Sequence, residues 1–413
     1  MRFFFLNQYY PPDGAPTGRV LQDLACQLVR DGHSVTVFCS RSLYGGADSV
    51  VHEEKGLDVR EVPSFPLGRK HVVQKLLHYA SFYLVLFFKL LLARQRPDVI
   101  VALTTPPYLG LLASVVAKLR GCRSVDWVMD LYPDVMRAHG MLSEQSRPYR
   151  LLQGVSAFYL RRSALVVTLG PDMAARVRDY YHGKYVPSLW VPLWASRGKD
   201  VSPELMAEYR EDRQWDMEKV VFLYSGNMGL GHLFDELCMV IAQRGPQGDG
   251  AKWVFCGQGA RHAQVADFVS AHSDHPVEMI DSVDEALLDV HLAAGDVHLA
   301  SLDPAWDGCM VPSKLQGSFA AGRPVLLVGS KRSSLAQWIL ESGGGWVVEA
   351  GDVRGLHEAV EIAMDPTERS DRGRRALAFA RKTFDRETNC KALEEGIVEA
   401  VGRSETHRAL GQA

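Results

Sequence analysis

The chain has 413 residues, enough for two domains of ordinary size, and its 47% hydrophobic and 23% charged content is typical of globular rather than disordered or fibrous proteins. Its formal net charge of −3 gives no electrostatic reason to expect nucleic acid as a partner. The seven cysteines include no CxxC pair, which argues against a zinc site or a disulfide framework and favours a reducing compartment such as the cytoplasm.

The first half of the chain alternates strand and helix patterns. A strand is expected over residues 2–8, followed by a Gly/Pro-rich loop over 9–18 and by a helix whose apolar residues recur at helical spacing up to Gly32. A β-branched strand at 34–39 then completes a βαβ unit. Its loop opens onto a helix N-terminus, where α/β folds bind phosphate, but without GxGxxG it also fits an ordinary tight turn. Further strands are expected at 58–62, 98–103, 123–129 and 164–169.

Residues 76–93 form an unusually apolar segment with basic residues on both sides. A membrane-spanning helix needs ~20 apolar residues, and this run is shorter and contains His78 and Lys89. Three interpretations remain open: a buried core helix, a helix that lies in a membrane surface, and a helix that binds a partner. Aromatic and aliphatic residues framed by cations favour the membrane surface. The flanking cations are Arg69, Lys70, Lys75, Arg94 and Arg96.

Two carboxylates follow the strand expected at 123–129. Ligands of doubly wound sheets bind at the carboxyl ends of parallel strands, so Asp130 is a candidate catalytic base or hydroxyl anchor. Asp134 follows Pro133 at the start of a helix, where we expect it to act as a cap.

A polar stretch over 197–219 fits a linker, after which the alternation of strands and helices begins again. Because such alternation implies a parallel sheet, we predict two α/β domains, an N-terminal one over 1–196 and a second one over 197–385. The strands expected in the second domain are 220–224, 253–256, 277–280, 297–300, 325–328 and 346–349.

Glycine loops follow the first two strands of the second domain. Residues 224–232 read Tyr-Ser-Gly-Asn-Met-Gly-Leu-Gly-His, so Gly226, Asn227 and Gly229 form a candidate phosphate cradle. The segment 257–259 repeats the pattern of a strand followed by a glycine turn. His232 is expected to be a cap or a surface group.

A loop, a short helix and a strand are expected over residues 311–328. Pro312 is tolerated in the first turn of a helix, which places Ser313 and Lys314 where free N–H groups and the positive end of the helix dipole attract anions. Lys314 adds a full positive charge. The pattern fits a phosphate site, or an ordinary connection that carries a surface lysine.

Taken together, these motifs resemble those of GT-B glycosyltransferases, and specifically the bacterial family 4 (group 1) enzymes. The subgroup that the chain is most similar to builds lipid-linked surface polysaccharides, such as the N-acetylfucosamine transferase type. The resemblance covers nearly the whole chain and rests on residues 8–18, 28–37, 130–134, 224–229 and, most specifically, 312–324.

The resemblance implies a GT-B fold, with two facing Rossmann-like domains, parallel sheets and a cleft between them. The first domain would bind the acceptor and the second the nucleotide-sugar donor, while a C-terminal helix at about 386–413 would cross back to the first domain. Such enzymes need no metal or other cofactor, because loop amides and basic side chains neutralise the diphosphate. The matching positions are Ser313, Lys314 and the loop Gly226–Gly229 with Asn227, and Gly18 in the N-terminal loop near the donor phosphate.

The sequence departs from the family at two glutamates. Aligned on residues 320–324, these positions hold Cys309 and Gly317, where the family supports the donor sugar and grips the ribose. Other residues must then supply the hydroxyl ligand, and Asp303 and Asp307 are candidates by position.

We therefore expect a retaining, metal-independent, hexosyltransferase-like enzyme that moves a sugar from a nucleoside-diphosphate donor to a saccharide acceptor. The expected acceptor is lipid-linked and lies at the inner face of the plasma membrane, where the enzyme would be a peripheral protein. Lys314 and loop N–H groups would stabilise the departing diphosphate. Two alternatives remain: a nucleotide-sugar 2-epimerase, which needs acid and base side chains, and a non-catalytic nucleotide-sugar-binding protein, suggested by the missing glutamates.

Overall fold

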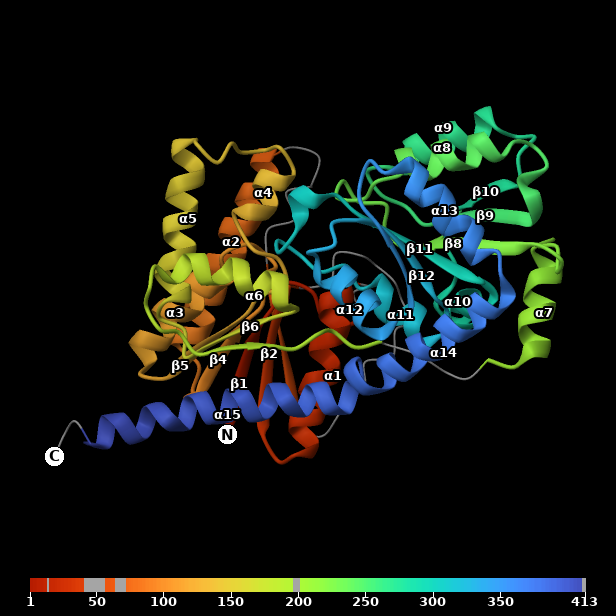
Figure 1. Cartoon of the computed structure of the whole chain (residues 1–413). Coiled ribbons are helices and arrows are strands. Elements are labelled where there is room, and N and C mark those ends of the chain that lie inside the picture. Colours follow the sequence, from red (N-terminus) through yellow and green to blue (C-terminus); the bar gives the residue numbers. More distant parts are fainter. Residues whose placement is uncertain (13–14, 41–55, 64–71, 196–200, 411–413) are drawn as a thin grey trace. The chain divides into compact units, whose positions relative to one another are not determined.

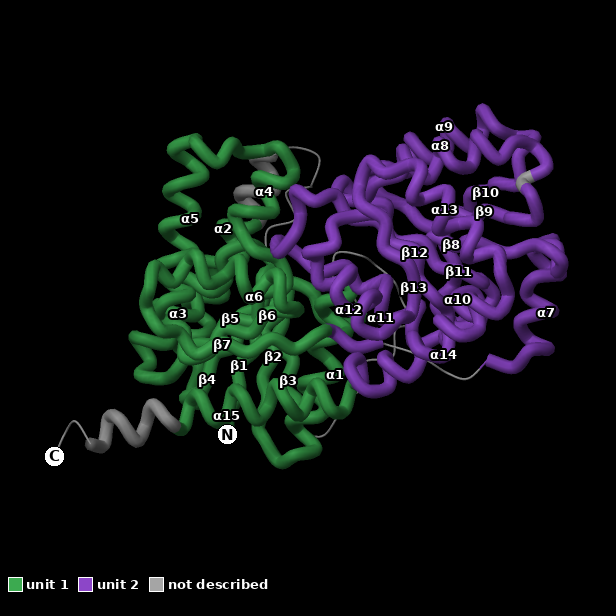
Figure 2. Tube along the Cα trace, viewed as in Figure 1, with its two compact units in different colours: residues 1–192, 386–413 green, residues 193–385 purple. Residues whose placement is uncertain are grey.

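The computed structural model describes residues 1–12, 15–40, 56–63, 72–195 and 201–410. The chain divides into two compact units (Figure 2), of which unit 1 comprises Met1–Pro192 with Arg386–Ala413 and unit 2 comprises Leu193–Asp385. Some sequence expectations fall outside the described residues: positions 13–14 of the N-terminal loop, the cations Arg69 and Lys70, positions 197–200 of the expected linker, and the last three residues.

In its described residues, unit 1 is built on a seven-stranded parallel sheet in the order β3-β2-β1-β4-β5-β6-β7 (Figure 1). The direction of the order changes between β1 and β4, so the loops after these two strands diverge there. All six predicted strands are confirmed, whereas β7 is short and half exposed and carries no apolar run that could reveal it. The strands are β1 Arg2–Leu6, β2 Ser34–Ser40, β3 Leu57–Val62, β4 Val99–Ala102, β5 Arg123–Trp127, β6 Leu165–Thr168 and β7 Ser188–Trp190.

Helices cover both faces of this sheet. The predicted helix is confirmed as α1, which buries its expected apolar stripe and packs against α15, where His33 Nε2 lies 2.7 Å from Glu394 Oε1. On the other face, α2 and α3 share one core with β1 and β4. The helices are α1 Pro16–Arg30, α2 Val72–Leu91, α3 Leu109–Arg120, α4 Asp134–Ala138, α5 Arg147–Leu160, α6 Pro171–Arg178 and α15 Arg386–Leu410.

The apolar segment predicted at 76–93 falls largely in α2, which has two apolar faces. Phe82, Leu86 and Leu90 are buried in the core, so this side of α2 is an ordinary core helix. Leu84 and Phe88 remain exposed on the other side. None of the helices that the structure describes is both long and apolar enough to cross a membrane.

Unit 2 holds a six-stranded parallel sheet in the order β10-β9-β8-β11-β12-β13. Its order changes direction between β8 and β11, which pair at Val297 and Phe222. All six predicted strands are confirmed: β8 Val220–Ser225, β9 Ala251–Cys256, β10 Val277–Ile280, β11 Val297–Leu302, β12 Val325–Gly329 and β13 Gly345–Val348. They were predictable because strands buried on both faces read as continuous apolar runs.

The helices of unit 2 include one that the sequence suggested only as linker. Helix α7 packs against α10, and the Arg210 guanidinium donates to Ala294 O and Asp296 Oδ2, so this part of 197–219 is an integral layer of the unit. The linker interpretation was wrong here because Tyr209 and Trp215 supply the buried contacts. The helices are α7 Pro203–Asp212, α8 Asp235–Arg244, α9 His262–Ala271, α10 Leu288–Ala294, α11 Lys314–Ala320, α12 Ser334–Ser342, α13 Val353–Ala363 and α14 Pro366–Thr383.

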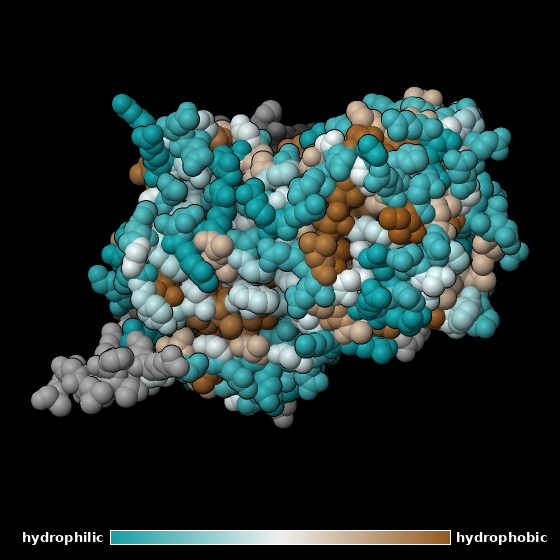
Figure 3. Space-filling model, viewed as in Figure 1, coloured by the Kyte–Doolittle hydropathy of each residue, from teal (hydrophilic) through white to brown (hydrophobic). Residues whose placement is uncertain are grey.

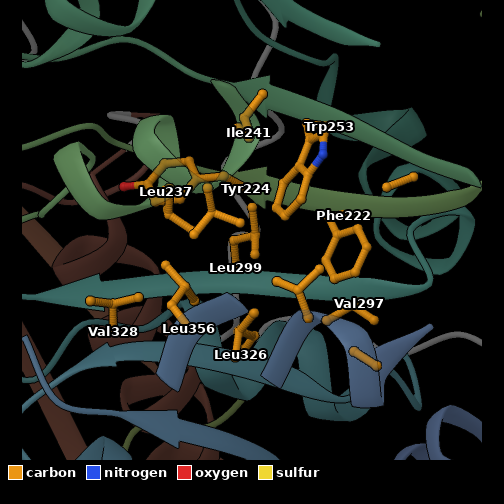
Figure 4. Close-up of a cluster of buried hydrophobic side chains, with 14 of the residues drawn as sticks. Phe222, Tyr224, Leu237, Ile241, Trp253, Val297, Leu299, Leu326, Val328 and Leu356 are labelled. Atoms are coloured by element: carbon orange, nitrogen blue, oxygen red, sulfur yellow. The ribbon is translucent and has the colours of Figure 1, made fainter. Parts of the chain in front are cut away.

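Aromatic and aliphatic side chains together form the core of unit 2 (Figure 4). Phe222 of β8 stacks on Trp253 of β9 with ring centroids 4.4 Å apart, and Leu299 and Leu326 extend the cluster across β11 and β12. Burying side chains of this size contributes roughly 1.5–3 kcal/mol each. The strands that carry the loops at the carboxyl edge of this sheet are therefore firmly held.

Exposed apolar residues are ordinary on this molecule. On the face shown in Figure 3, hydrophilic residues predominate and hydrophobic ones form separate patches. Scattered exposed apolar side chains need no special explanation, so such residues become informative only where they adjoin a pocket.

Candidate functional site

Two glycine loops meet at the carboxyl edge of the unit 2 sheet. The Gly226 N–H donates to Cys256 O at 2.9 Å, and the Met228 N–H donates to Gln258 O at 2.8 Å. Gly226 and Gly257 have φ values of 125° and 136°, and a Cβ at Gly257 would lie 2.1 Å from Gly226 O. These glycines are thus required for close backbone packing, whether or not a phosphate binds there.

Lys314 begins α11 and reaches across to the loop that follows β8. Its Nζ donates to Asn227 O at 2.9 Å, lies 3.1 Å from His232 Nε2, and stands 4.8 Å from the centre of the Tyr224 ring. A Cβ at Gly226 would lie 3.1 Å from Lys314 Cε, so the glycine also leaves room for the lysine. The structure therefore brings Lys314, Gly226 and Asn227 together, with Asn227 acting through its backbone carbonyl.

His232 fixes the direction of the bond to Lys314. Its Nδ1 lies 2.6 Å from Ser301 O, and because a carbonyl can only accept, Nδ1 carries the proton. Nε2 then carries no proton and accepts a hydrogen bond from the Lys314 Nζ. His232 is buried, so the expectation of a cap or surface group was wrong.

Burial shifts the pKa values of both side chains toward the neutral forms. It lowers the pKa of Lys314 to about 7, and it lowers the pKa of His232 to about 4, with the nearby Lys314 charge as a second cause. An ammonium has three N–H donors, and Asn227 O and His232 use two. Among the described residues no carboxylate pairs with Lys314, so its third donor and its charge are available to an anion.

The sequence predicts three other residues of unit 2 at the site of the nucleotide-sugar donor. Ser313 is the exposed N-cap residue of α11, and its side chain makes no capping bond. The Gly229 carbonyl accepts from the His232 N–H at 3.1 Å. Gly317 is turned toward α10, since a Cβ there would lie 3.4 Å from Leu292 Cδ1. Because α11 has only seven residues, the charge of Lys314 outweighs its helix dipole.

Cys309 stands at the first glutamate position of the family, and Asp303 and Asp307 are the residues expected to supply the missing hydroxyl ligand. Cys309 is fully buried. Asp303 caps the short helix Pro304–Trp306, accepting from the Ala305 N–H at 2.8 Å, and Asp307 follows at the end of that helix, partly buried. No three His, Cys, Asp or Glu side chains in the described parts of the chain are grouped as metal ligands would be.

Asp130 lies at the carboxyl edge of the unit 1 sheet, just after β5. Its N–H donates to Thr104 Oγ1 at 3.1 Å, which ties it to the loop after β4. Burial raises the pKa of its carboxyl group to about 6, and its charge in turn contributes to the raised pKa of Tyr132. No described residue donates a hydrogen bond to this carboxylate, so it can take up a proton or accept a hydrogen bond from a hydroxyl group of a ligand.

Asp134, only four residues further on, has a structural role. Its carboxylate receives the Arg176 Nε and Nη2 donors at 2.8 and 2.6 Å and the hydroxyl groups of Tyr149 and Tyr180. Pro133 occupies the N-cap position of α4, so the capping prediction for Asp134 was wrong. The side chain turns instead into a buried network that joins α4 to α5 and α6.

Gly18 lies in the first turn of α1, where it packs against backbone. A Cβ there would lie 3.1 Å from atoms of both Tyr9 and Tyr10. Glycine is needed for this close approach, and the loop residues at 13–14 that precede the helix are outside the described residues.

Two α/β units, each built on a parallel sheet, are the architecture of the GT-B fold. Residues 17–194, most of unit 1, match the family model described as "Glycosyl transferase 4-like domain", so this part of the chain is similar to the family 4 glycosyltransferases. It is 25% identical over 363 residues to the "Probable glycosyltransferase WbjE" of Pseudomonas aeruginosa, covering 87% of this chain and 88% of the relative. It is also 23% identical over 356 residues to the "Putative colanic acid biosynthesis glycosyl transferase WcaI" of Escherichia coli K12, covering 82% and 85%.

Solved structures show the same fold at low sequence identity. The sucrose-phosphate synthase of Thermosynechococcus elongatus superposes with a TM-score of 0.72 at 16% identity, covering 98% of this chain and all of that one. Anabaena HepE in complex with UDP-glucose superposes with a TM-score of 0.67 at 15% identity, covering 97% and 100%. The predicted GT-B class is confirmed, while the resemblance to N-acetylfucosamine transferases stays a prediction.

Proposed function

We propose that this glycosyltransferase moves a sugar from a nucleoside-diphosphate donor to a saccharide acceptor carried on a lipid, during synthesis of a cell-surface polysaccharide. The names of WbjE and WcaI support glycosyl transfer, and that of WcaI places it in polysaccharide synthesis. HepE, which has the same fold, binds UDP-glucose. The observation that carries the proposal is the unneutralised Lys314 ammonium, which keeps one N–H donor unused.

On the donor side, Lys314 provides the positive charge that a departing diphosphate requires. Its two fixed hydrogen bonds hold Nζ in place before the ligand arrives, so little reorganisation is needed as charge develops on the phosphate. A bound diphosphate would in turn favour the charged lysine and offset the cost of its burial. With this cation in place we propose that the reaction needs no metal and, as in the family, retains the anomeric configuration.

On the acceptor side, Asp130 is the group that we propose to orient or deprotonate the acceptor hydroxyl. A carboxyl pKa of about 6 leaves the group mostly ionised near neutral pH yet basic enough to take up a proton. No residue that the structure describes pairs with its carboxylate, unlike that of Asp134. A lipid carrier for the acceptor would place the enzyme at the inner face of the plasma membrane.

The test is incubation of the purified protein with a panel of labelled nucleotide sugars and membrane lipid extract. Label that enters the lipid fraction, and that fails to do so with Lys314→Ala, is the expected result, with the exposed Lys331→Ala as matched control. Exchange at C2 of the donor without any acceptor would instead identify an epimerase. Donor binding without turnover across the panel would identify a binding protein, and either outcome overturns the proposal.

A further inference from the structure

Unit 1 contains an apolar pocket of about 460 Å³ between α2, α3 and α5. Its wall includes Tyr83 of α2, Tyr108 beside α3, Leu111 and Val115 of α3, and Val155 of α5. The Tyr83 hydroxyl donates to the Pro107 carbonyl, so this residue can present its ring rather than its polar tip. A volume in the range of ordinary ligand sites, with an apolar wall, suits a hydrocarbon group.

The outer surface of the same three helices continues this apolar character. Val115 is 40% exposed, and Leu119 lies one helical turn further on the same face of α3 at 60% exposed. On α5, Leu151 and Phe158 flank the pocket residue Val155 by one turn on either side, and both are exposed. These side chains extend the apolar character of the pocket along α3 and α5, and α2 carries two exposed apolar residues of its own, Leu84 and Phe88.

The charge of these helices is also unusual. The chain as a whole has 49 acidic and 46 basic residues, yet α2, α3 and α5, with 20, 12 and 14 residues, contain no Asp or Glu. Their cations include Lys89 and Arg120, which donate to backbone carbonyls of Glu61 and Leu91 and so keep their full charge. An apolar pocket between helices that carry basic and no acidic residues matches a lipid that bears phosphate.

Two tyrosines connect the wall of the pocket to the surroundings of Asp130. Tyr108 forms part of this wall and stands 6.2 Å, ring centre to ring centre, from Tyr132, which is close enough to Asp130 for the two to interact electrostatically. Tyr108 also has a positive φ of 70°, which is uncommon for a bulky residue. Strained backbone conformations of this kind cluster at functional sites. The occupant of the pocket would therefore reach the edge of the sheet where the acceptor is proposed to react.

We propose that this pocket binds a hydrocarbon chain of the phosphate-bearing lipid that carries the acceptor saccharide. The inference rests on the proposed function, because it assigns a site to the lipid part of that acceptor. It predicts that the enzyme distinguishes acceptors by their lipid as well as by their sugar.

The test separates lipid binding from transfer. Binding of a polyprenyl phosphate, without donor, is measured for the wild type, for Val115→Asp, which places a charge at the pocket, and for Val155→Trp, which fills it. Ile362→Asp, a similarly exposed site on α13 of unit 2, is the matched control. Both pocket variants should weaken binding at least about tenfold, because a chain loses its apolar contacts, whereas Ile362→Asp should not change it.

Kinetics give the second measurement. The KM for the lipid-linked acceptor should rise by a similar factor in both pocket variants, while kcat and the KM for the same saccharide on a short water-soluble aglycone stay unchanged. Equal losses with both acceptors, or unchanged polyprenyl phosphate binding in a variant whose melting temperature is normal, would overturn the inference. If the two pocket variants lose binding to phospholipid vesicles without the polyprenyl lipid by the same factor, the pocket would be assigned to a bilayer lipid instead. If the wild type binds the lipid but transfers no sugar, the proposed function fails while the pocket assignment stands.

Discussion

In unit 1 the loop after β5 presents a carboxylate, Asp130, whose pKa burial raises to about 6, whereas in unit 2 the residues after β11 lead to an ammonium, Lys314, whose pKa burial lowers to about 7. Both groups follow strands of parallel sheets, at the edge where such sheets bind ligands. No described residue neutralises either of them with an opposite charge. The two groups follow strands at different places in their sheets, since β11 lies next to the change of strand order and β5 lies one strand beyond it. The residue that follows the strand decides whether the position attracts an anion or a proton.

Replacing Asp130 with Asn tests the carboxylate at the edge of the unit 1 sheet and should have the largest effect on the transfer rate. The amide has the same shape but cannot take a proton, so the transfer rate should fall roughly 100- to 10,000-fold. Calorimetry should find donor binding unchanged, since the donor is assigned to the other unit. A transfer rate within a factor of two of the wild type would remove Asp130 from the mechanism.

The stability of the same variant, compared with that of the wild type, should change with pH in a direction that the pKa shift fixes. Because the pKa of Asp130 is raised on folding, the wild-type carboxyl favours the folded state at low pH, and this contribution is lost as pH rises from about 4 through 6. The melting temperature of the wild type should therefore fall relative to that of Asp130→Asn as pH rises across this window. A constant difference would show that the carboxylate is solvated like an ordinary surface group.

Asp134→Ala sharpens the comparison inside unit 1, because this neighbouring carboxylate is paired. Removing it leaves Arg176 and two tyrosine hydroxyl groups without their acceptor, which should lower the free energy of unfolding by about 3–5 kcal/mol in urea titrations. Activity per folded molecule should stay close to that of the wild type. A stable Asp134→Ala protein that lacks transfer activity would reverse the roles assigned to the two residues.

Lys314→Ala tests the opposite edge, in unit 2. Loss of a charge-assisted hydrogen bond to the diphosphate should weaken donor binding by about 1.5–3 kcal/mol, or roughly 10- to 150-fold in Kd. Calorimetry with a nucleoside diphosphate measures this, with the exposed Lys331→Ala as control. An unchanged Kd would exclude contact between Lys314 and the phosphates.

The sequence was a good guide to the two sheets and a poor one to side-chain partners. Most of the strands are buried apolar runs and were predicted from them, whereas β3 is largely exposed and the short β7 was missed. Glycine loops and Lys314 were also recognisable as separate motifs. Their contact was not, because Lys314 and Asn227 are 87 residues apart and only the folded sheet brings them together.

Two errors and one undecided interpretation have the same origin in tertiary contacts. Asp134 stands at a helix start, where local rules predict a cap, but α5 and α6 offer it buried donors. His232 looked like a surface group because Ser301, which holds its Nδ1, belongs to a distant strand. In α2 the apolar residues surround the helix, so composition alone could not separate the buried side of Phe82 from the exposed side of Leu84.

The pH dependence of donor binding and of transfer compares Lys314 with Asp130 within one protein, and it is the smallest effect that we expect. Donor binding needs the charged form of Lys314, so affinity should fall as pH rises above about 7, by up to about tenfold per pH unit, until the pKa of the complex is reached. Transfer also needs ionised Asp130, so kcat/KM should fall on the acid side below about 6 as well. Lys314→Arg, whose side chain stays charged throughout, should abolish the alkaline fall in binding and leave the acid limb of transfer in place. If the alkaline fall survives in Lys314→Arg, another group titrates at the donor site, and the charge assigned to unit 2 has been placed on the wrong residue.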